Sequence, residues 1–485
     1  MINMKKTTFF LFLTVFVFLN FRCSSGFEQT RNKPNIVFIY ADDLGWKDAG
    51  FMGSKYYETP NIDALSRSGM VFTNAYANAP NCAPSRAALM TGLYAPRTGI
   101  YTVGTSKRGK SKFRKIIPVK NKTVLDTSFV TVAEVLKDNG YVTASIGKWH
   151  LGEGEITGPT GQGFDVNVGG WHLGHPKSYF SPYGNPYLPD GPKGEYLTDR
   201  LTEEAIKFIE ENKGRPFFLY FPHYAVHTPL QAKDSLKDGF KSKTPDGKQD
   251  NPTYAAMVES LDESVGRIIK TLNKLGLIEN TIIIFTSDNG GYGPATDMAP
   301  LRGSKGMLYE GGIREPFIVS WKGKIKEGTK TDFPIIGTDM FPTILSLTSS
   351  KLPQRLTLDG IDLKNIFLKS ELPDKRALFW FFPAYLEKYR GMKDLWRTTP
   401  AAAVRYGNYK FIRFFEDGRE ELYDLKNDIG EKNDLSGSDT IKRKVLSTLL
   451  DEWIISTNAP VPSEPNPGFD KKAYHKKLNE LKGDN

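Results

Sequence analysis

Four oxygen-bearing side chains stand just after two strongly apolar runs of this sequence. Asp42 and Asp43 follow the run at 35–40, and Asp288 and Asn289 follow the run at 281–286. Three carboxylates that meet at one place repel one another unless a cation lies between them. Because no His or Cys pair with zinc spacing accompanies them, the set favours a hard cation such as Ca²⁺ or Mg²⁺. Taken singly, each residue is equally well explained as a helix N-cap or a turn residue.

The elements that would bring these residues together alternate along the chain. Apolar runs typical of buried parallel strands are separated by helical patterns. The alternation indicates an α/β fold, with a large, mostly parallel mixed sheet flanked by helices. In such folds ligands bind at the carboxyl ends of the strands, where Lys148, His150, His223 and His227 also stand. Strands are predicted at 35–40, 141–146, 217–221 and 281–286, and helices at 131–138, 198–211 and 254–275.

The short segment that begins at Cys82 favours a functional explanation of these polar residues over a purely structural one. It reads CAPSR up to Arg86 and continues to TG at 91–92, and Pro84 and Ser85 predict a helix start. This CxPSR pattern resembles the signature of the type I sulfatases, a family of the alkaline phosphatase superfamily, with Met90 where leucine is usual. The resemblance implies that Cys82 is oxidised to formylglycine, whose hydrated aldehyde is the nucleophile.

Further motifs of the same family follow in the expected order between residue 34 and about residue 436. The DD pair at 42–43 and DNG at 288–290 are similar to its metal-binding motifs, and GKWHLG at 147–152, HTP at 227–229 and LRGSKG at 301–306 are similar to its lysine and histidine motifs. One motif alone is weak, but five in order are specific. The resemblance implies that the catalytic residues are Cys82, Arg86, Lys148, His150, His227 and Lys305, and that Ca²⁺ is held by Asp42, Asp43, Cys82, Asp288 and Asn289.

A sulfate ester is surrounded by negative oxygens, so a site that hydrolyses it must first neutralise charge. Ca²⁺ together with Lys148, Lys305 and Arg86 would supply the positive charge. The resemblance implies that His227 protonates the leaving alcohol and that His150 accepts a proton when the aldehyde re-forms. A chain whose cysteine stays unconverted should therefore be almost inactive.

Candidate substrate-binding residues outside these motifs are predicted only from their position in the sequence. His172 and His175 lie in a loop at 168–192 that is rich in Gly, Pro and Tyr. The loop aromatics would suit stacking on sugar rings, although burial within the loop explains them as well. Arg97, near the signature, and Asp297 and Arg302, near the second lysine, are further candidates for the substrate pocket.

A different pattern begins at about residue 373. Short segments at 401–405, 409–414 and 420–424 are separated by turn residues, among them Gly407 and Gly418. They predict a short antiparallel sheet, followed by a helix at 440–456 and a tail rich in Pro and Lys. We therefore expect a catalytic domain at 33–372 and a smaller C-terminal domain with its tail at 373–485.

The first 22 residues predict an export signal, because Lys5 and Lys6 precede an apolar run at 9–19 that is too short to span a bilayer. Cys23 stands where a bacterial lipoprotein signal places its lipidated cysteine, although Arg22 replaces the small residue usual there. Plain cleavage near Gly26 is the alternative. We expect an exported protein, periplasmic or at the cell surface, with a lipid on Cys23 as its only membrane attachment.

The net charge of +10, which falls by three to about +7 without the signal, is spread along the chain. This spread argues against nucleic-acid binding and suits an anionic substrate. We therefore expect a sulfatase that acts on a sulfated carbohydrate, such as ulvan, carrageenan or a glycosaminoglycan. Its partner in maturation would be a formylglycine-generating or anaerobic sulfatase-maturing enzyme. The alternatives are a phosphatase or phosphonate monoester hydrolase of the same superfamily, and an inactive carbohydrate-binding lipoprotein.

Overall fold

The structure is a computed structural model, and it describes residues 33–354 and 356–483. The expected signal at 1–22 and the expected lipidation site, Cys23, lie outside the described residues. Within the described ranges, no helix combines the length and the apolar character that crossing a membrane requires.

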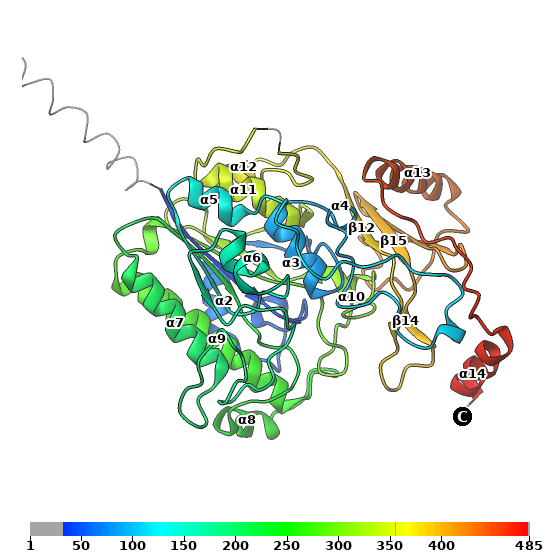
Figure 1. The fold of residues 1–485 in the computed structure, drawn as a ribbon, viewed down its shortest axis with the longest axis horizontal. Coiled ribbons are helices and arrows are strands. Elements are labelled where there is room, and N and C mark those ends of the chain that lie inside the picture. Colours follow the sequence, from blue (N-terminus) through cyan, green and yellow to red (C-terminus); the bar gives the residue numbers. More distant parts are fainter. Residues whose placement is uncertain (1–32, 355, 484–485) are drawn as a thin grey trace, which may run out of the picture.

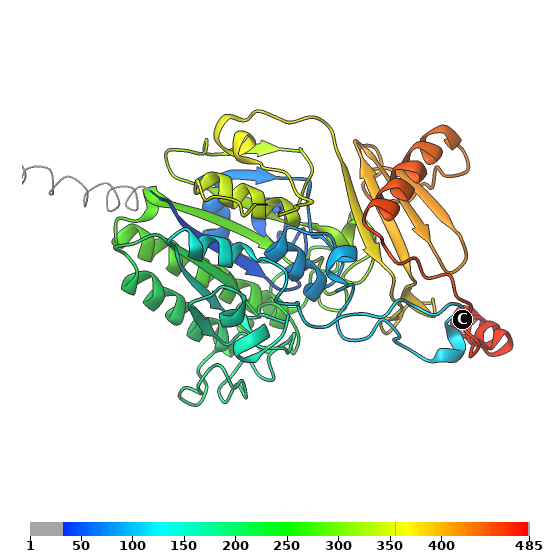
Figure 2. The ribbon, with the colours of Figure 1, turned by 45° about the horizontal axis from the view of Figure 1, so that its top comes forward.

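An eight-stranded sheet forms the centre of the larger part of the molecule (Figures 1 and 2). Its middle strand, β1, pairs in parallel with β6 on one side and with β7 on the other. β4 and β5 continue the parallel order beyond β6, whereas β9 runs antiparallel to both of its neighbours. In order across the sheet the strands are β10 (Thr329–Thr331), β2 (Met70–Phe72), β9 (Phe317–Ser320), β7 (Thr281–Ser287), β1 (Asn35–Ala41), β6 (Phe217–Pro222), β4 (Val142–Ile146) and β5 (Val166–Val168).

Helices cover both faces of this sheet because its central strands are apolar on both sides. Val37 and Ile39 of β1 belong to one core, with α2, α7 and α9, and Ile36 and Phe38 belong to the other, with α3, α5, α11 and α12. The helices are α2 (Pro60–Arg67), α3 (Cys82–Thr91), α5 (Val132–Asp138), α7 (Leu197–Glu211), α9 (Pro252–Lys274), α11 (Met340–Leu347) and α12 (Lys364–Lys369), with short helices α4 (Ala95–Thr98), α6 (Gly154–Thr157), α8 (Asp234–Lys241) and α10 (Glu310–Ile313).

The predicted fold class is confirmed. The four strands predicted for the sheet are β1, β4, β6 and β7, each with bounds within one residue of the prediction. The strands that were not predicted, β2, β5, β9 and β10, have only three or four residues each. A segment of that length carries too few residues for its pattern to be read.

A four-stranded antiparallel sheet lies beside the larger part, with α13 packed on it (Figure 2). The three strands predicted here are present, and β12 adds a fourth that was not predicted. A further helix, α14, occupies the segment expected to be a tail. The elements are β12 (Ala377–Phe382), β15 (Ala401–Tyr406), β16 (Tyr409–Phe414), β17 (Glu420–Asp424), α13 (Thr440–Ser456) and α14 (Lys471–Gly483), and two small sheets are formed by β13 (Leu386–Glu387) with β14 (Trp396–Thr398) and by β11 (Ile335–Ile336), β3 (Ala75–Tyr76) and β8 (Arg314–Glu315).

A buried group of charges joins this smaller sheet to the larger part of the molecule. The Lys410 ammonium on β16 lies 3.0 Å from the carboxylate of Glu310, in α10, and 2.8 Å from that of Glu431. Tyr76 of β3 also donates a hydrogen bond of 2.8 Å to Glu310. Because an unpaired charge is costly in such a place, these contacts fix the smaller sheet against α10.

Gly147, which follows β4, allows the strand to end close to the end of β6. Its φ is 122°, and a Cβ at this position would lie 1.9 Å from the carbonyl oxygen of Pro222. We predict that Gly147→Ala destabilises the protein by more than the ~1–2 kcal/mol that a left-handed backbone alone costs a residue with a Cβ. Chemical denaturation of purified protein measures this loss.

Gly140→Ala is the matched control, because Gly140 has a φ of 82° but no atom within 4 Å of its would-be Cβ. The free energy of unfolding of this variant should fall by no more than the cost of the left-handed backbone conformation. Equal losses in the two variants would contradict the close approach of the two strand ends.

Candidate active site

The carboxyl ends of four neighbouring strands bring the predicted site residues to one edge of the sheet. Asp42 follows β1, Lys148 follows β4 and Asp288 follows β7. His223, after β6, is different: it is fully buried, and its ring lies 3.3 Å from the Ser264 hydroxyl in α9. The strand order thus assembles a site at the edge that the sequence predicted, without His223.

Asp42 and Lys148 form a buried ion pair at the floor of the site. The Lys148 ammonium donates to both carboxylate oxygens of Asp42, at 2.8 and 2.7 Å, and both side chains are fully buried. Burial raises the pKa of Asp42 well above its usual value, against the opposing charge of Lys148. The carboxylate therefore depends on nearby positive charge to stay ionised.

Arg86 holds the second carboxylate. Its Nε and Nη2 lie 3.0 and 2.6 Å from the same oxygen of Asp288, and its Nη1 donates to the backbone carbonyl of Lys148 at 3.0 Å. Burial opposes the charge on Asp288, but Arg86 and Lys148 keep the pKa of that carboxyl below its usual value. Arg86 thus ties the end of β7 to the end of β4.

Asp43 is the third carboxylate, and it faces Lys305 and His227. The Lys305 ammonium lies 2.7 Å from the carboxylate, and His227 Nε2 lies 3.5 Å from it and 3.0 Å from Lys305 Nζ. Burial would raise the pKa of Asp43, but Lys305 and His227 hold it well below its usual value. Asn289 Nδ2 donates to the other side of the same carboxylate at 2.8 Å.

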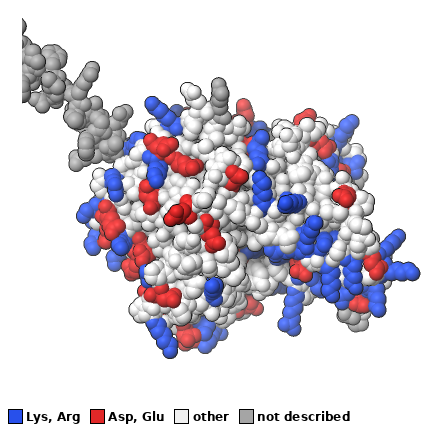
Figure 3. Space-filling view, in the orientation of Figure 1, with Lys and Arg blue, Asp and Glu red and all other residues white. Residues whose placement is uncertain are grey.

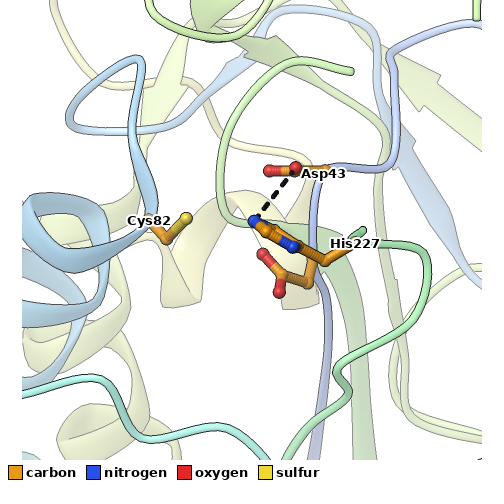
Figure 4. A group of neighbouring side chains, drawn as sticks. Asp43, Cys82 and His227 are labelled. Atoms are coloured by element: carbon orange, nitrogen blue, oxygen red, sulfur yellow. Dashed lines mark ion pairs between the residues drawn. The ribbon is translucent and has the colours of Figure 1, made fainter. Parts of the chain in front are cut away.

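Cys82 is the first residue of α3, so this helix begins two residues before the predicted start. The Ser85 hydroxyl bonds instead to the backbone of Ala79, which fixes the turn into the helix. Figure 4 shows the Cys82 side chain pointing toward Asp43 and His227, and one ligand atom from each of Asp42, Asp43, Cys82 and His227 lies within 4.8 Å of all the others.

The electrostatic surroundings of Cys82 favour an anion at its side chain. Burial raises the pKa of the thiol, but Lys148, Lys305 and a hydrogen bond with His227 lower it to about 6. The N-terminus of the helix adds to this effect, since its free backbone N–H groups carry partial positive charge. Position 82 is therefore built for a negatively charged oxygen or sulfur.

His150 is the second histidine of the site, and it is 8% exposed. Burial first, and then Lys148 and Arg86, push its pKa well below the usual value, so the ring is neutral. Its Nδ1 is buried and has no hydrogen-bond partner among the described residues. His150 also has a positive φ of 63°, as Asp43 has at 62°. Backbone of this kind in residues with side chains is concentrated at functional sites.

The residues at this edge fit a hard divalent cation. They offer the carboxylate oxygens of Asp42, Asp43 and Asp288, and the Oδ1 atom of Asn289 is buried without a partner among the described residues. A buried amide oxygen without a donor is costly, and an oxygen-preferring ion would satisfy it. Oxygen donors of this kind favour Ca²⁺ or Mg²⁺ over a thiophilic metal.

A cavity of about 650 Å³ opens over this cluster. Cys82, His150, His227 and Lys305 line it, as do the predicted substrate residues His172 and His175. His172 Nδ1 lies 2.5 Å from a carboxylate oxygen of Glu153, and the His175 ring is nearly parallel to that of His227, at a centroid distance of 6.2 Å. The loop at 168–192 thus covers one side of the site.

The other three predicted substrate residues do not line this cavity. The Arg97 guanidinium is bound to Asp359 at 2.9 Å. Arg302 donates to the Tyr423 hydroxyl at 2.9 Å and lines a neighbouring cavity, and Asp297 accepts a hydrogen bond from the backbone of Ala299. Their expected substrate contacts remain predictions from position.

Two arginines that the sequence analysis did not single out do line the cavity, Arg108 and Arg397. Arg397 comes from β14, more than 300 residues after Cys82 in a chain of 485. A basic run around 107–115 was the only signal in the sequence, and it did not indicate which residue reaches the site.

Comparisons with known proteins agree with this geometry. A family model described as Sulfatase matches residues 34–350, and one described as N-sulphoglucosamine sulphohydrolase, C-terminal, matches residues 304–456. A protein named Sulfatase from Formosa agariphila is 33% identical over 89% of this chain and 91% of its own length. Human N-acetylgalactosamine-6-sulfatase is 30% identical over 91% of this chain and 88% of its own length.

Among solved structures, that of Ps i-CgsB superposes with a TM-score of 0.75, at 31% identity, over 93% of this chain and 98% of that chain. It has also been solved in complex with k-i-k-neocarrahexaose. These matches and the site make the protein a sulfuric ester hydrolase built on the α/β fold of the alkaline phosphatase superfamily. The chain belongs to the sulfatase family.

The electrostatics of Cys82 can be tested directly in metal-free protein whose cysteine has not been converted. We predict that the ultraviolet absorbance of the thiolate disappears as the pH falls through about 6, because Lys148 and Lys305 stabilise the ionised form. An ordinary cysteine would lose this absorbance near a pH of about 8.5. The Cys82→Ala variant supplies the baseline. A midpoint near the ordinary value would contradict the placement of the two lysines beside the sulfur.

Proposed function

We propose that this sulfatase hydrolyses sulfate esters of a sulfated carbohydrate, with formylglycine formed from Cys82. Ca²⁺ would be held by Asp42, Asp43, Asp288, Asn289 and the side chain at position 82. The observation that carries the proposal is the position of Cys82, which begins α3, lines the cavity and lies within the electrostatic influence of both lysines. The names of the relatives support the substrate class, since they include an N-acetylgalactosamine-6-sulfatase and a structure that holds a neocarrahexaose. A carrageenan, an ulvan or a glycosaminoglycan is therefore the proposed source of the substrate.

Neutralisation of charge is the first task of the protein side chains. Lys148 and Lys305 both lie near enough to Cys82 to favour the ionised form of its side chain. A sulfate group placed there would meet two ammonium groups in a largely buried site, where electrostatic attraction is stronger than in water. Arg86 contributes indirectly, since it offsets the charge of Asp288 and fixes the backbone of Lys148.

Proton transfer is assigned to the two histidines. His227 Nδ1 lies 2.8 Å from the carbonyl oxygen of Thr228, so Nδ1 carries a proton and Nε2 is the atom that faces Lys305 and the cavity. In the protonated ring, Nε2 is placed to donate to the oxygen of the leaving alcohol. His150, neutral and with an unpartnered Nδ1, is placed to accept a proton. Formylglycine at position 82, once formed, supplies the attacking oxygen, and Ca²⁺ supplies positive charge beside it.

We also propose that the protein is exported and is either anchored by a lipid on Cys23 or cleaved near Gly26. The basic and apolar pattern of the first 22 residues supports export. A polymeric substrate outside the cell is consistent with this location.

The proposal is tested by mass spectrometry of the peptide that contains Cys82, from protein made in a host with a maturation enzyme, together with a desulfation assay. The assay panel contains oligosaccharides of carrageenan, ulvan and glycosaminoglycans, and phosphate and phosphonate monoesters. We expect the mass of formylglycine at position 82 and release of sulfate from a saccharide. Cys82→Ala should lose this activity. An unconverted thiol in an active enzyme, or hydrolysis of the phosphorus esters alone, would overturn the proposal.

Calcium should stabilise the folded protein, because the cation binds the assembled carboxylates and not the unfolded chain. At a Ca²⁺ concentration about 100 times the Kd, the free energy of unfolding should rise by ~2.7 kcal/mol, and Mg²⁺ should have a smaller effect. Asn289→Ala should weaken the Ca²⁺ effect, because it removes the unpartnered Oδ1. Thermal denaturation with Ca²⁺, with Mg²⁺ and with a chelator measures these differences.

The control is Asp138→Asn, which changes an exposed carboxylate on α5. Its Ca²⁺ effect should equal that of the unchanged protein. The same Ca²⁺ effect in Asn289→Ala would contradict the assignment of Asn289 as a ligand.

A further inference from the structure

The cavity over Cys82 contains more positive charge than one sulfate ester requires. Besides Lys305 at its base, it is lined by Arg108 and Arg397. Among the residues that the structure describes, neither arginine has a carboxylate oxygen within 4.0 Å, whereas most other buried cations of the site are paired. Arg108 Nη2 donates to the backbone carbonyl of Val103 at 2.7 Å. Two guanidinium groups without a carboxylate partner at the wall of a cavity nevertheless require an explanation.

Arg397 is held in place next to Lys305. Its guanidinium lies 4.1 Å above the ring of Tyr389, and the Tyr389 hydroxyl donates to the backbone carbonyl of Lys305 at 3.1 Å. Gly306 makes room for it, since a Cβ there would lie 2.9 Å from Arg397 Nε and 3.1 Å from its Cζ. The Nε atom is buried and has no hydrogen-bond partner in the described part of the chain. The side chain is thus fixed by packing, while its buried Nε donor is left without a partner.

Arg108 is held in place by a separate set of contacts. Arg114 donates to three successive carbonyl oxygens, those of Lys107, Arg108 and Gly109, at 3.1, 2.9 and 2.6 Å. These hydrogen bonds fix the backbone of the loop that carries Arg108. Gly109 packs on Trp396, with 2.5 Å between a would-be Cβ and the indole ring. The loop therefore rests on β14, the strand that carries Arg397.

The two guanidinium groups influence each other. Burial and the charge of Arg397 both lower the pKa of Arg108. Glu387, which is exposed, and Cys82, which is buried, oppose this change. Two cations that approach without a counterion destabilise each other, and an anion between them would relieve that repulsion. The planar guanidinium group also matches sulfate or carboxylate oxygens in bidentate geometry.

We propose that Arg108 and Arg397 form a subsite for a second anionic group, a sulfate or a carboxylate, on the same saccharide whose sulfate ester is hydrolysed. This inference rests on the proposed function and adds to it a substrate requirement: a saccharide with at least two anionic groups. The scissile sulfate lies at Lys148 and Lys305, and the second group lies at the arginines.

The shape of the surrounding surface agrees with a substrate that extends beyond one sugar. Arg397 also lines a neighbouring cavity of about 580 Å³, whose charged lining consists of four basic residues and three acidic ones: Arg302, Arg397, Arg419, Lys482, Asp394, Glu416 and Asp417. Figure 3 shows Lys and Arg side chains gathered over the same side of the molecule, at its lower right, where α14 lies in Figure 1. A sulfated chain that passes the two arginines would continue over a basic surface.

The test compares Arg108→Gln, Arg397→Gln and the double variant with the unchanged enzyme on saccharides that differ in one anionic group. The probes are kappa- and iota-carrageenan oligosaccharides, glucosamine 6-O-sulfate and D-glucosamine-2-N,6-O-disulfate, chondroitin sulfate disaccharides with and without a second sulfate, and an aryl sulfate. For the sugar that loses sulfate, we expect each variant to lower kcat/KM of the doubly charged form roughly tenfold or more, mainly through KM. The singly charged form and the aryl sulfate should be hydrolysed almost as before.

Two further variants separate a charge requirement from a structural one. Arg397→Lys keeps the charge and loses the bidentate geometry, so it should recover part of the lost kcat/KM. Arg443→Gln removes a partly exposed arginine on α13 that pairs with Glu420 and does not line the cavity, and it should leave both substrates unaffected. Calorimetric binding of the same saccharides to Cys82→Ala proteins, with and without the arginine changes, gives the affinity loss without turnover.

The outcomes distinguish this inference from the proposed function. If the unchanged enzyme releases sulfate from none of the saccharides, the proposed function fails, and the inference fails with it. If the unchanged enzyme is active but does not prefer the doubly charged form, or if the arginine variants lose activity equally on both forms, the inference alone is overturned.

Discussion

The balance of buried charges at the carboxyl ends of β7, β1 and β4 is the constraint on which the rest of the site depends. Three carboxylates lie there in a volume that excludes water, and each pairs with a cation from another part of the chain. Loss of one partner from such a buried pair costs about 3–5 kcal/mol, because the remaining charge has neither water nor a counterion. The segments between the strands must therefore place Arg86, Lys148 and Lys305 at the same edge of the sheet. The function that we propose uses the same cations to bind sulfate.

The C-terminal part of the chain completes this site and does not merely accompany it. The buried contacts of Lys410 with Glu310 and Glu431 fix the small sheet against α10, a few residues after Lys305. β14 then brings Arg397 to the cavity wall, and Tyr389 contacts the backbone of Lys305. The division of the chain into residues 33–372 and 373–485 remains a prediction, and the cavity takes residues from both sides of it.

Much of the fold and the chemical centre follows from the sequence. Runs such as 35–40 and 281–286 are strongly apolar and buried along their whole length, as strands covered on both faces are, and their bounds were predicted to within one residue. The polar residues that end these runs had to meet, because parallel neighbours end at the same edge of a sheet. Cys82 and its neighbours were identified by a local pattern. A helix start placed at Pro84 was wrong by two residues, since Ser85 bonds to the backbone of Ala79 and not as a cap.

Only the tertiary structure decided which further side chains line the cavity. Arg97, Asp297 and Arg302 lie near the motifs in sequence, yet their side chains bind elsewhere, whereas Arg108, in a loop, and Arg397, on β14, reach the cavity from segments with no motif. The physical reason is that strand ends are fixed by a repeating backbone pairing, which a local pattern of apolar residues encodes. The walls of the cavity are fixed by contacts between segments that are hundreds of residues apart, such as Gly109 with Trp396 of β14, and no local pattern encodes those.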